Sequence, residues 1–257
     1  MMSEYVLVES GDGILQVKMN RPEKKNALSF LMYKELTQAL LDADENPAVR
    51  VVVLSGQGGC FTAGNDLGDF LTATTEPEKL SAALHFLQAI STMKKPVIAA
   101  VDGLAIGIGT SMLLHCDLVF GATETKFQLP FTRLGVVPEG GTSLLLPQTL
   151  GHRVAFELVV MGEVFGADRA RELGVVNEVL PADEVLARAL SAAQTLTQMP
   201  PKALLNGKQL LKTSQDCTLA EALEAEMAQF KQALQSAESL EAITAILEKR
   251  APDFSDC

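Results

Sequence analysis

One glutamate of this chain stands in a segment that suits proton transfer. Glu139 lies between Pro138 and Gly140, at the end of an apolar stretch. A carboxylate surrounded by apolar side chains loses hydration, so burial raises its pKa and makes it a stronger base. The alternative is a turn or helix-cap residue, a role in which Glu is less effective than Ser, Asp or Asn. Candidates for an apolar wall around Glu139 are Phe131, Leu134, Val136 and Val137.

Two glycine-containing turns could supply backbone N–H groups to a developing negative charge. The segment 60–67 (CFTAGNDL) follows the run VVVL, and the segment 103–109 leads into an apolar helix. The first N–H groups of a helix lack intrahelical acceptors and can bind an anion. Either turn alone could serve only close packing. Because turns that follow successive strands of an α/β sheet share one edge, together they predict an oxyanion hole.

The elements that must hold these turns alternate between strands and helices, which indicates an α/β fold with right-handed crossovers. A DG turn between the first two strands favours a hairpin, and Ser29 is the expected cap of the first helix. The predicted strands are Tyr5–Glu9, Ile14–Met19, Val49–Leu54, Pro96–Val101, Leu118–Gly121 and Val175–Leu180. The predicted helices run from Ser29 to about Asp44, and over Glu76–Met93, Gly107–Cys116, Thr142–Leu150 and His152–Met161.

After these elements the pattern becomes entirely helical. We expect an α/β core over residues 1–198, which contains the active site, and a helical region over residues 199–257. So long a helical region cannot bury all its apolar faces on the core, and packing against another subunit would cover them. The four predicted helices are Asp183–Leu196, Pro201–Thr213, Thr218–Gln235 and Glu238–Arg250.

The composition excludes several classes of function. The 257 residues carry a formal net charge of −11, which argues against binding to nucleic acid or to an anionic membrane. No apolar run reaches the length of a membrane span, and no secretory signal is visible at the N-terminus. The four cysteines form no CxxC pair and the three histidines have no metal-ligand spacing. We expect a cytoplasmic protein with free thiols and no metal site.

Four segments resemble the crotonase (enoyl-CoA hydratase/isomerase) superfamily in the order in which that superfamily has them. They are NRPEKKNALS, FTAGNDL, KPVIAAVDGLAIGIGTSMLLHCDLVFGATETKFQLPFTRLGVVPEGG and LVVMGEVFGADRARELGVVNEV. The resemblance implies a spiral of repeated ββα units with a helical C-terminal appendage, assembled as a homotrimer or a dimer of trimers. It also implies an acyl-CoA thioester substrate, of which coenzyme A is a part, and no separate cofactor.

Within that superfamily, the resemblance implies that the backbone amides of Asn65 and Ile108 form the oxyanion hole. Hydratases of the superfamily carry two glutamates, at positions occupied here by Ser111 and Phe131. Glu139 instead matches the single catalytic glutamate of the 3,2-trans-enoyl-CoA isomerase branch. Moving a double bond needs one group that removes a proton and returns it elsewhere, whereas hydration needs two. Replacing both Ser111 and Phe131 by Glu would supply the missing pair.

The remaining candidate residues are assigned to substrate binding or loop support. Asp66 could bond backbone N–H groups and hold the first turn. Lys24 and Lys25 could meet the nucleotide end of CoA, or be an ordinary solvated surface pair. Two alternatives stay open: another crotonase-fold enzyme, such as a hydratase or a ring-type CoA thioester isomerase, and a non-catalytic acyl-CoA or partner-binding module. The residues expected to line the substrate are Lys25, Ala27, Ala63, Gly64, Asp66, Leu67, Gly107 and Phe131.

Overall fold

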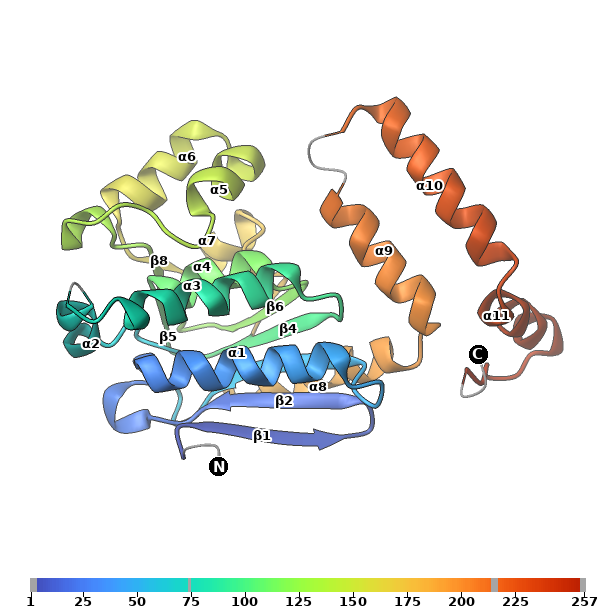
Figure 1. Cartoon of the computed structure of the whole chain (residues 1–257), viewed down its shortest axis with the longest axis horizontal. Coiled ribbons are helices and arrows are strands. Elements are labelled where there is room, and N and C mark those ends of the chain that lie inside the picture. The colour runs from blue at the N-terminus through green and yellow to red at the C-terminus, as the bar shows by residue number, and fades with distance from the viewer. Residues whose placement is uncertain (1–3, 74, 214–216, 255–257) are drawn as a thin grey trace.

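Six strands form the main sheet, in the order β1-β2-β3-β4-β6-β9 (Figure 1). The computed structural model describes residues 4–73, 75–213 and 217–254. β1 and β2 pair antiparallel across the predicted turn at Asp12–Gly13, and every later pair in this sheet is parallel. The strands are β1 (Val6–Gly11), β2 (Ile14–Met19), β3 (Val51–Gly56), β4 (Val97–Val101), β6 (Leu118–Ala122) and β9 (Glu178–Leu180).

The central strands are apolar on both faces because helices cover both faces. In β3, Val52 and Leu54 pack into a core with α1 (Phe30–Glu45) and α3 (Pro77–Thr92). Val51 and Val53 face the other way, onto α8 (Ala182–Thr197). The predicted cap of α1 is confirmed, since the Ser29 Oγ accepts from the Met32 N–H at 3.3 Å. The predicted α/β fold is therefore confirmed, with helices on both faces of the main sheet.

A second, smaller sheet was not predicted from the sequence. It has the order β5-β7-β8, with β5 and β7 parallel and β7 and β8 antiparallel. Strands of two or three residues are too short to show the alternation by which strands are recognised. The three strands are β5 (Leu104–Ile106), β7 (Lys126–Gln128) and β8 (Phe165–Gly166).

Several helices differ from their predicted extents. The apolar segment 107–116 is not one continuous α-helix but a single turn, α4 (Ile108–Ser111), followed by a 3₁₀ helix, η2 (Met112–His115). The expected helix over 152–161 begins as α6 (His152–Phe156) and ends as a π-helix, η4 (Glu157–Met161). The other elements of the core are η1 (Pro22–Lys24), α2 (Leu67–Thr72), η3 (Thr132–Leu134), α5 (Thr142–Leu150) and α7 (Ala167–Glu172).

The C-terminal helices extend away from the main sheet, as Figure 1 shows for α9 (Pro201–Thr213), α10 (Leu219–Leu234) and α11 (Ala237–Glu248). One ion pair fastens α9 to the core: the buried Lys208 Nζ lies 2.6 Å from the Asp117 Oδ2 and 2.7 Å from the Lys95 carbonyl oxygen. The buried Glu238 carboxylate accepts from the N–H groups of Lys202 and Ala203 in the first turn of α9. A division into two domains near residue 198 stays a prediction.

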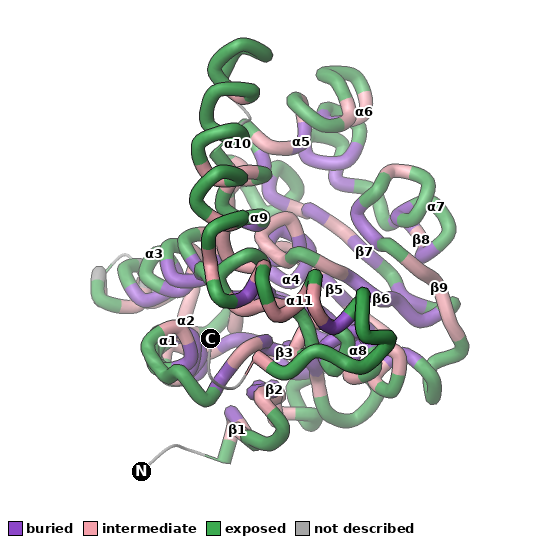
Figure 2. Tube along the Cα trace, turned by 90° about the vertical axis from the view of Figure 1, so that its right-hand side faces the viewer, coloured by how far each residue is buried: buried purple, intermediate pink, exposed green. Residues whose placement is uncertain are grey.

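Much of the surface of α10 is exposed, as Figure 2 shows. Its exposed apolar residues recur at intervals of three or four, which places them along one face of the helix. They are Leu219, Leu223, Met227, Phe230 and Leu234. Across the described residues, no helix is long and apolar enough to cross a membrane. Within the same residues, no group of three or more potential metal ligands is found.

Candidate active site

The two glycine-containing turns are hydrogen-bonded to each other. The Thr62 N–H donates to the Leu104 carbonyl oxygen at 2.8 Å, and the Ile106 N–H donates to the Thr62 carbonyl oxygen at 3.1 Å. Gly64 has a φ of 91°, and a Cβ at this position would lie 2.6 Å from the Ile106 carbonyl oxygen. Only glycine therefore permits this approach. The expectation that both turns meet at one edge is confirmed.

The middle of the first turn, residues 61–66, leaves one amide without an acceptor among the described residues. The N–H of Ala63 donates to the Lys25 carbonyl oxygen at 2.9 Å, and that of Gly64 to the Thr62 Oγ1 at 3.1 Å. The N–H of Asp66 donates to the Leu28 carbonyl oxygen at 2.9 Å. Between them, the Asn65 N–H has no acceptor among the described residues.

The second turn repeats this arrangement at the start of α4. The Gly107 N–H donates to the Gln128 carbonyl oxygen at 2.8 Å, and the Thr110 N–H turns back to the Gly107 carbonyl oxygen at 2.9 Å. The Ile108 N–H finds no acceptor in the described part of the chain. Gly107 has a φ of 57°, a conformation that favours glycine. Both predicted oxyanion donors are thus without an acceptor among the described residues, and they stand on two turns that contact each other.

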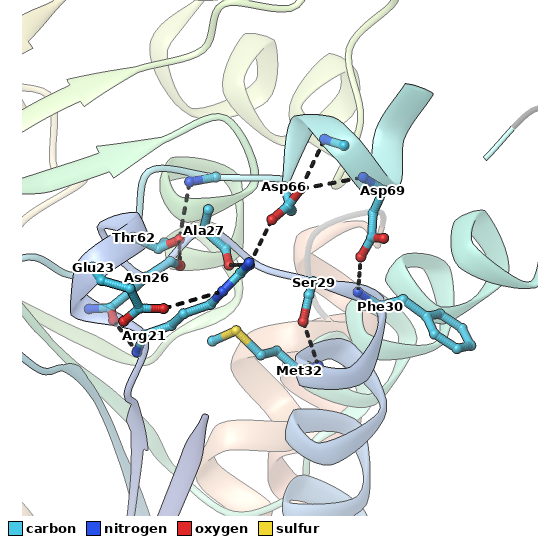
Figure 3. A network of polar contacts seen from close by, with 12 residues as sticks. Arg21, Glu23, Asn26, Ala27, Ser29, Phe30, Met32, Thr62, Asp66 and Asp69 are labelled. Atoms are coloured by element: carbon cyan, nitrogen blue, oxygen red, sulfur yellow. Dashed lines mark hydrogen bonds and ion pairs between the residues drawn. The ribbon is translucent and has the colours of Figure 1, made fainter. Parts of the chain in front are cut away.

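A polar network holds the first turn against the loop before α1 (Figure 3). The Arg21 Nη1 lies 2.7 Å from the Asp66 Oδ2, and the Asp66 Oδ1 accepts from the N–H groups of Gly68 and Asp69. Burial alone would raise the pKa of Asp66, but the hydrogen bonds from Arg21 and from those amides outweigh it and lower the pKa. Asp66 therefore bonds backbone amides as predicted, and it also bonds Arg21, which sequence analysis missed.

Asn26 is a second supporting residue that sequence analysis missed. It is fully buried at a φ of 53°, and its Nδ2 donates to the carbonyl oxygens of Gln57 and Cys60. Its Oδ1 accepts from the Arg21 N–H at 2.7 Å. The sequence did not indicate this supporting role, because the partners of the Asn26 side chain lie up to 34 residues away in the chain.

Glu139 borders a cavity of about 520 Å³ beside these turns. The predicted apolar residues Leu134, Val136 and Val137 form part of its wall. Among the described residues that line it, Glu139 is the only carboxylate. The predicted site residues on this cavity are Ala63, Gly64, Asn65, Leu67, Gly107, Phe131 and Glu139.

The Glu139 carboxyl has one buried oxygen and a raised pKa. Its Oε1 is buried, and among the described residues it has no hydrogen-bond partner. Burial raises the pKa of Glu139, and a hydrogen bond from the Asn65 side chain offsets part of this increase. A carboxylate with a raised pKa, beside two available N–H donors and an apolar cavity, has the parts needed to form and stabilise an enolate.

Four candidate positions do not border this cavity. Asp66 borders a separate, smaller cavity and pairs with Arg21. Lys25 is exposed, and its carbonyl oxygen accepts from the Ala63 N–H. The Ala27 carbonyl oxygen accepts from the Arg21 Nη1 at 3.1 Å. Ile108 is fully buried and offers its amide alone. Lys25 and Ala27 thus support the first turn through their backbones, and a contact of either with substrate stays a prediction.

His115 contacts the segment that carries Glu139. Its Nε2 lies 2.9 Å from the carbonyl oxygen of Gly140, the residue that directly follows Glu139. Burial lowers the pKa of His115, which favours the neutral ring at neutral pH. The sequence pattern gave no role for His115, because the contact joins residues 25 positions apart.

Comparison with known proteins supplies the wider context for this geometry. A family profile described as enoyl-CoA hydratase/isomerase matches residues 9–257. The 2,3-dehydroadipyl-CoA hydratase of Escherichia coli K12 is 32% identical over 98% of this chain and 99% of its own. The 1,2-epoxyphenylacetyl-CoA isomerase of the same organism is 30% identical over 99% of both chains. A solved chain from Magnetospirillum magneticum AMB-1, provisionally named enoyl-CoA hydratase/carnithine racemase, is 43% identical with a TM-score of 0.95, and 99% of this chain and 100% of that one are covered.

Proposed function

Because the chain belongs to the enoyl-CoA hydratase/isomerase family, we propose that it moves the double bond of a 3-enoyl-CoA thioester to the 2-trans position. Glu139 removes a proton from C2 of the thioester. The electrons of that C–H bond form a dienolate, whose charge spreads onto the thioester oxygen. Glu139 then returns the same proton at C4, so the reaction needs neither water nor a redox partner.

The oxyanion of the dienolate is the species to be stabilised. The N–H groups of Asn65 and Ile108 are the donors proposed for it, since neither has an acceptor among the described residues. Preorganised donors of this kind stabilise charge that develops during the reaction without reorganisation at that moment. The apolar cavity beside Glu139 suits the acyl chain, and the exposed Lys24 and Lys25 are proposed to meet the anionic nucleotide end of CoA.

The observation that carries this proposal is that Glu139 is the single carboxylate among the described residues that line the cavity. Syn addition of water to a 2-enoyl thioester requires two groups that handle one water molecule. The two positions at which hydratases of this superfamily hold those glutamates are here Ser111, which is fully buried, and Phe131. One base is sufficient for a proton transfer from C2 to C4.

A second candidate is an isomerase for ring-type CoA thioesters. It is favoured by the 1,2-epoxyphenylacetyl-CoA isomerase among the relatives and by the apolar character of the cavity. A non-catalytic acyl-CoA-binding module is disfavoured, because binding alone needs no buried carboxylate beside two unpaired amides. We also propose a homotrimer or a dimer of trimers, and the cytoplasm as its location.

Spectrophotometric assays on one enzyme preparation test the proposal. Isomerisation of a short 3-enoyl-CoA and hydration of the corresponding 2-enoyl-CoA are followed side by side, with Glu139→Gln as the matched control. We expect isomerisation that depends on Glu139 and negligible hydration. Hydration as fast as isomerisation would reject the one-base mechanism, and turnover of a ring-type thioester alone would favour the second candidate.

A further inference from the structure

Asn65 lies between two other polar groups that come from distant parts of the chain. Its Oδ1 accepts a hydrogen bond from the Tyr33 hydroxyl. Its side chain also lies beside Glu139, since both residues border the same two cavities, and Asn65 offsets part of the rise in the pKa of the Glu139 carboxyl. The backbone N–H of the same residue is one of the two proposed oxyanion donors. A single residue thus contacts both halves of the proposed machinery, the base and the oxyanion hole.

The Tyr33 hydroxyl is the donor in this contact. Tyr33 is 3% exposed on α1, and its ring packs against Phe86 of α3 with the centroids 5.8 Å apart. Burial, and to a smaller extent the negative charge of Glu139, raise the pKa of the Tyr33 hydroxyl well above its usual value. The hydroxyl therefore keeps its proton at all working pH values, and it donates that proton to the Asn65 Oδ1.

The orientation of the Asn65 amide follows from this contact. An ionised carboxylate only accepts hydrogen bonds, so the group that faces Glu139 must be the Nδ2 of Asn65. The flipped amide would place its Oδ1 against the Glu139 carboxylate and lose the Tyr33 donor at the same time. Tyr33 and Glu139 thus select the same orientation from opposite ends.

We propose that the Asn65 side chain is a positioning residue for Glu139, and that Tyr33 fixes the Asn65 amide in the orientation this requires. The inference rests on the proposed function in that Glu139 is the base. Asn65 would then have two separate roles: its backbone N–H binds the oxyanion, and its Nδ2 holds one carboxylate oxygen of Glu139. The buried Oε1 of Glu139, which has no partner among the described residues, is left to take the substrate proton.

The other charged groups near Glu139 are paired among themselves. A small cavity of about 30 Å³ is bordered by Tyr33, Asn65 and Glu139 together with Asp66, Asp69 and Lys79. Asp66 pairs with Arg21 at 2.7 Å, and Asp69 with Lys79 at 3.1 Å. His115 contacts the carbonyl oxygen of Gly140. Since each of these groups has its own partner, Asn65 is the residue whose loss should act most directly on Glu139.

The test measures the titration of Glu139 without any substrate. Infrared difference spectra of protein labelled with carbon-13 at Glu report the carboxyl groups, and Glu139→Gln identifies the band of Glu139. We expect Tyr33→Phe to shift the midpoint of that band to higher pH by about one unit, the loss typical of a hydrogen bond to a charged group. Asn65→Ala, which keeps the backbone N–H, should shift it at least as far.

Non-additivity distinguishes positioning from a general structural effect. Because Tyr33 acts through Asn65, the double variant Tyr33→Phe/Asn65→Ala should titrate no higher than Asn65→Ala alone. Tyr5→Phe, at the only other tyrosine of the chain, is the matched control and should leave the midpoint unchanged. A midpoint that does not move in Tyr33→Phe, or shifts that add in the double variant, would overturn the inference.

The same variants separate this inference from the proposed function. If the protein acts on another thioester, the titration shift still occurs and only the isomerisation assay fails. If the inference is wrong, isomerisation remains while the titration of Glu139 is insensitive to Tyr33. In an active enzyme, we expect the acidic limb of the kcat/KM profile of Tyr33→Phe to move in the same direction as the titration, and KM to change little.

Discussion

Gly140 lies directly against the side chain of Ser111. A Cβ at Gly140, which has a φ of 67°, would lie 2.7 Å from the Ser111 Oγ. Ser111 itself is fully buried, and its Oγ lies 3.4 Å from the Ile108 carbonyl oxygen. The segment that carries Glu139 therefore occupies the space that a longer side chain at position 111 would need.

This contact changes what is expected of an attempt to build a hydratase. The sequence suggested that Ser111→Glu together with Phe131→Glu would restore the pair of carboxylates. In the structure, a Glu at position 111 would have to displace Gly140 or remain buried without a partner. We expect Ser111→Glu to lower the free energy of unfolding by about 2 kcal/mol or more, measured by denaturant titration. Neither Phe131→Glu nor the double variant should hydrate a 2-enoyl-CoA, and measurable hydration by either one would contradict this.

Replacement of the proposed base should remove catalysis and leave binding. Glu139→Gln keeps the size of the side chain but cannot accept the C2 proton. A general base contributes about 10²–10⁴ in rate, so we expect a loss of that size in kcat for isomerisation. Binding of a saturated acyl-CoA, measured by calorimetry, should be unchanged. A variant that retains most of its kcat would remove Glu139 from the mechanism.

The same substitution should stabilise the fold at neutral pH. Burial raises the pKa of Glu139, so the folded protein binds its proton more tightly than the unfolded chain does. The stability contributed by the protonated form is present at low pH and is lost as the pH rises through the folded pKa. We therefore expect Glu139→Gln to have a higher melting temperature than wild type at pH 7.

This advantage of Glu139→Gln should disappear below the unfolded pKa of Glu, near pH 4. Thermal melts at the two pH values check the sign. A difference of about 1 kcal/mol moves the midpoint by about 2–4 °C in a chain of this size. An equal gain at both pH values would mean that the effect comes from something other than the buried charge.

Loss of the ion pair between Arg21 and Asp66 should disturb the first turn and should not act directly on Glu139. Asp66→Ala removes the partner of Arg21 and the side-chain acceptor at the start of α2, which costs about 1 kcal/mol in typical helix caps. Because Asn65 is the neighbouring residue, we expect kcat to fall roughly tenfold, less than the about 10²–10³ lost when an oxyanion donor is removed. Asp66→Asn, which keeps an acceptor for the cap, should be intermediate. An unchanged kcat in Asp66→Ala would show that the turn holds its shape without this pair.

The exposed apolar face of α10 predicts self-association. Phe230 is 63% exposed and Met227 is 52% exposed, on the same face of the helix. We expect light scattering to give the mass of a trimer or hexamer at micromolar concentration. Phe230→Glu should shift this mass towards the monomer, whereas Gln232→Glu, the same charge change elsewhere on α10, should not. A monomeric wild type would contradict the prediction.

The sequence by itself determined the elements whose cause is local. The buried run of β3 is apolar on both faces, Ser29 caps its own helix, and the two glycine-containing turns follow from residues adjacent in the chain. These features depend on neighbouring residues, and neighbouring residues are what a sequence pattern shows. The proposed donors, Asn65 and Ile108, came instead from the family resemblance, and their role stays a prediction.

Tertiary structure alone decided which distant side chains meet. Tyr33 contacts Asn65 across 32 positions, Arg21 contacts Asp66 across 45, and Lys208 contacts Asp117 across 91. No local pattern indicates such pairs, since their members come together only when helices and turns from distant parts of the chain pack together. The short strands of the second sheet escaped prediction for the same reason: two or three residues become a strand only through the partner that completes their hydrogen bonds.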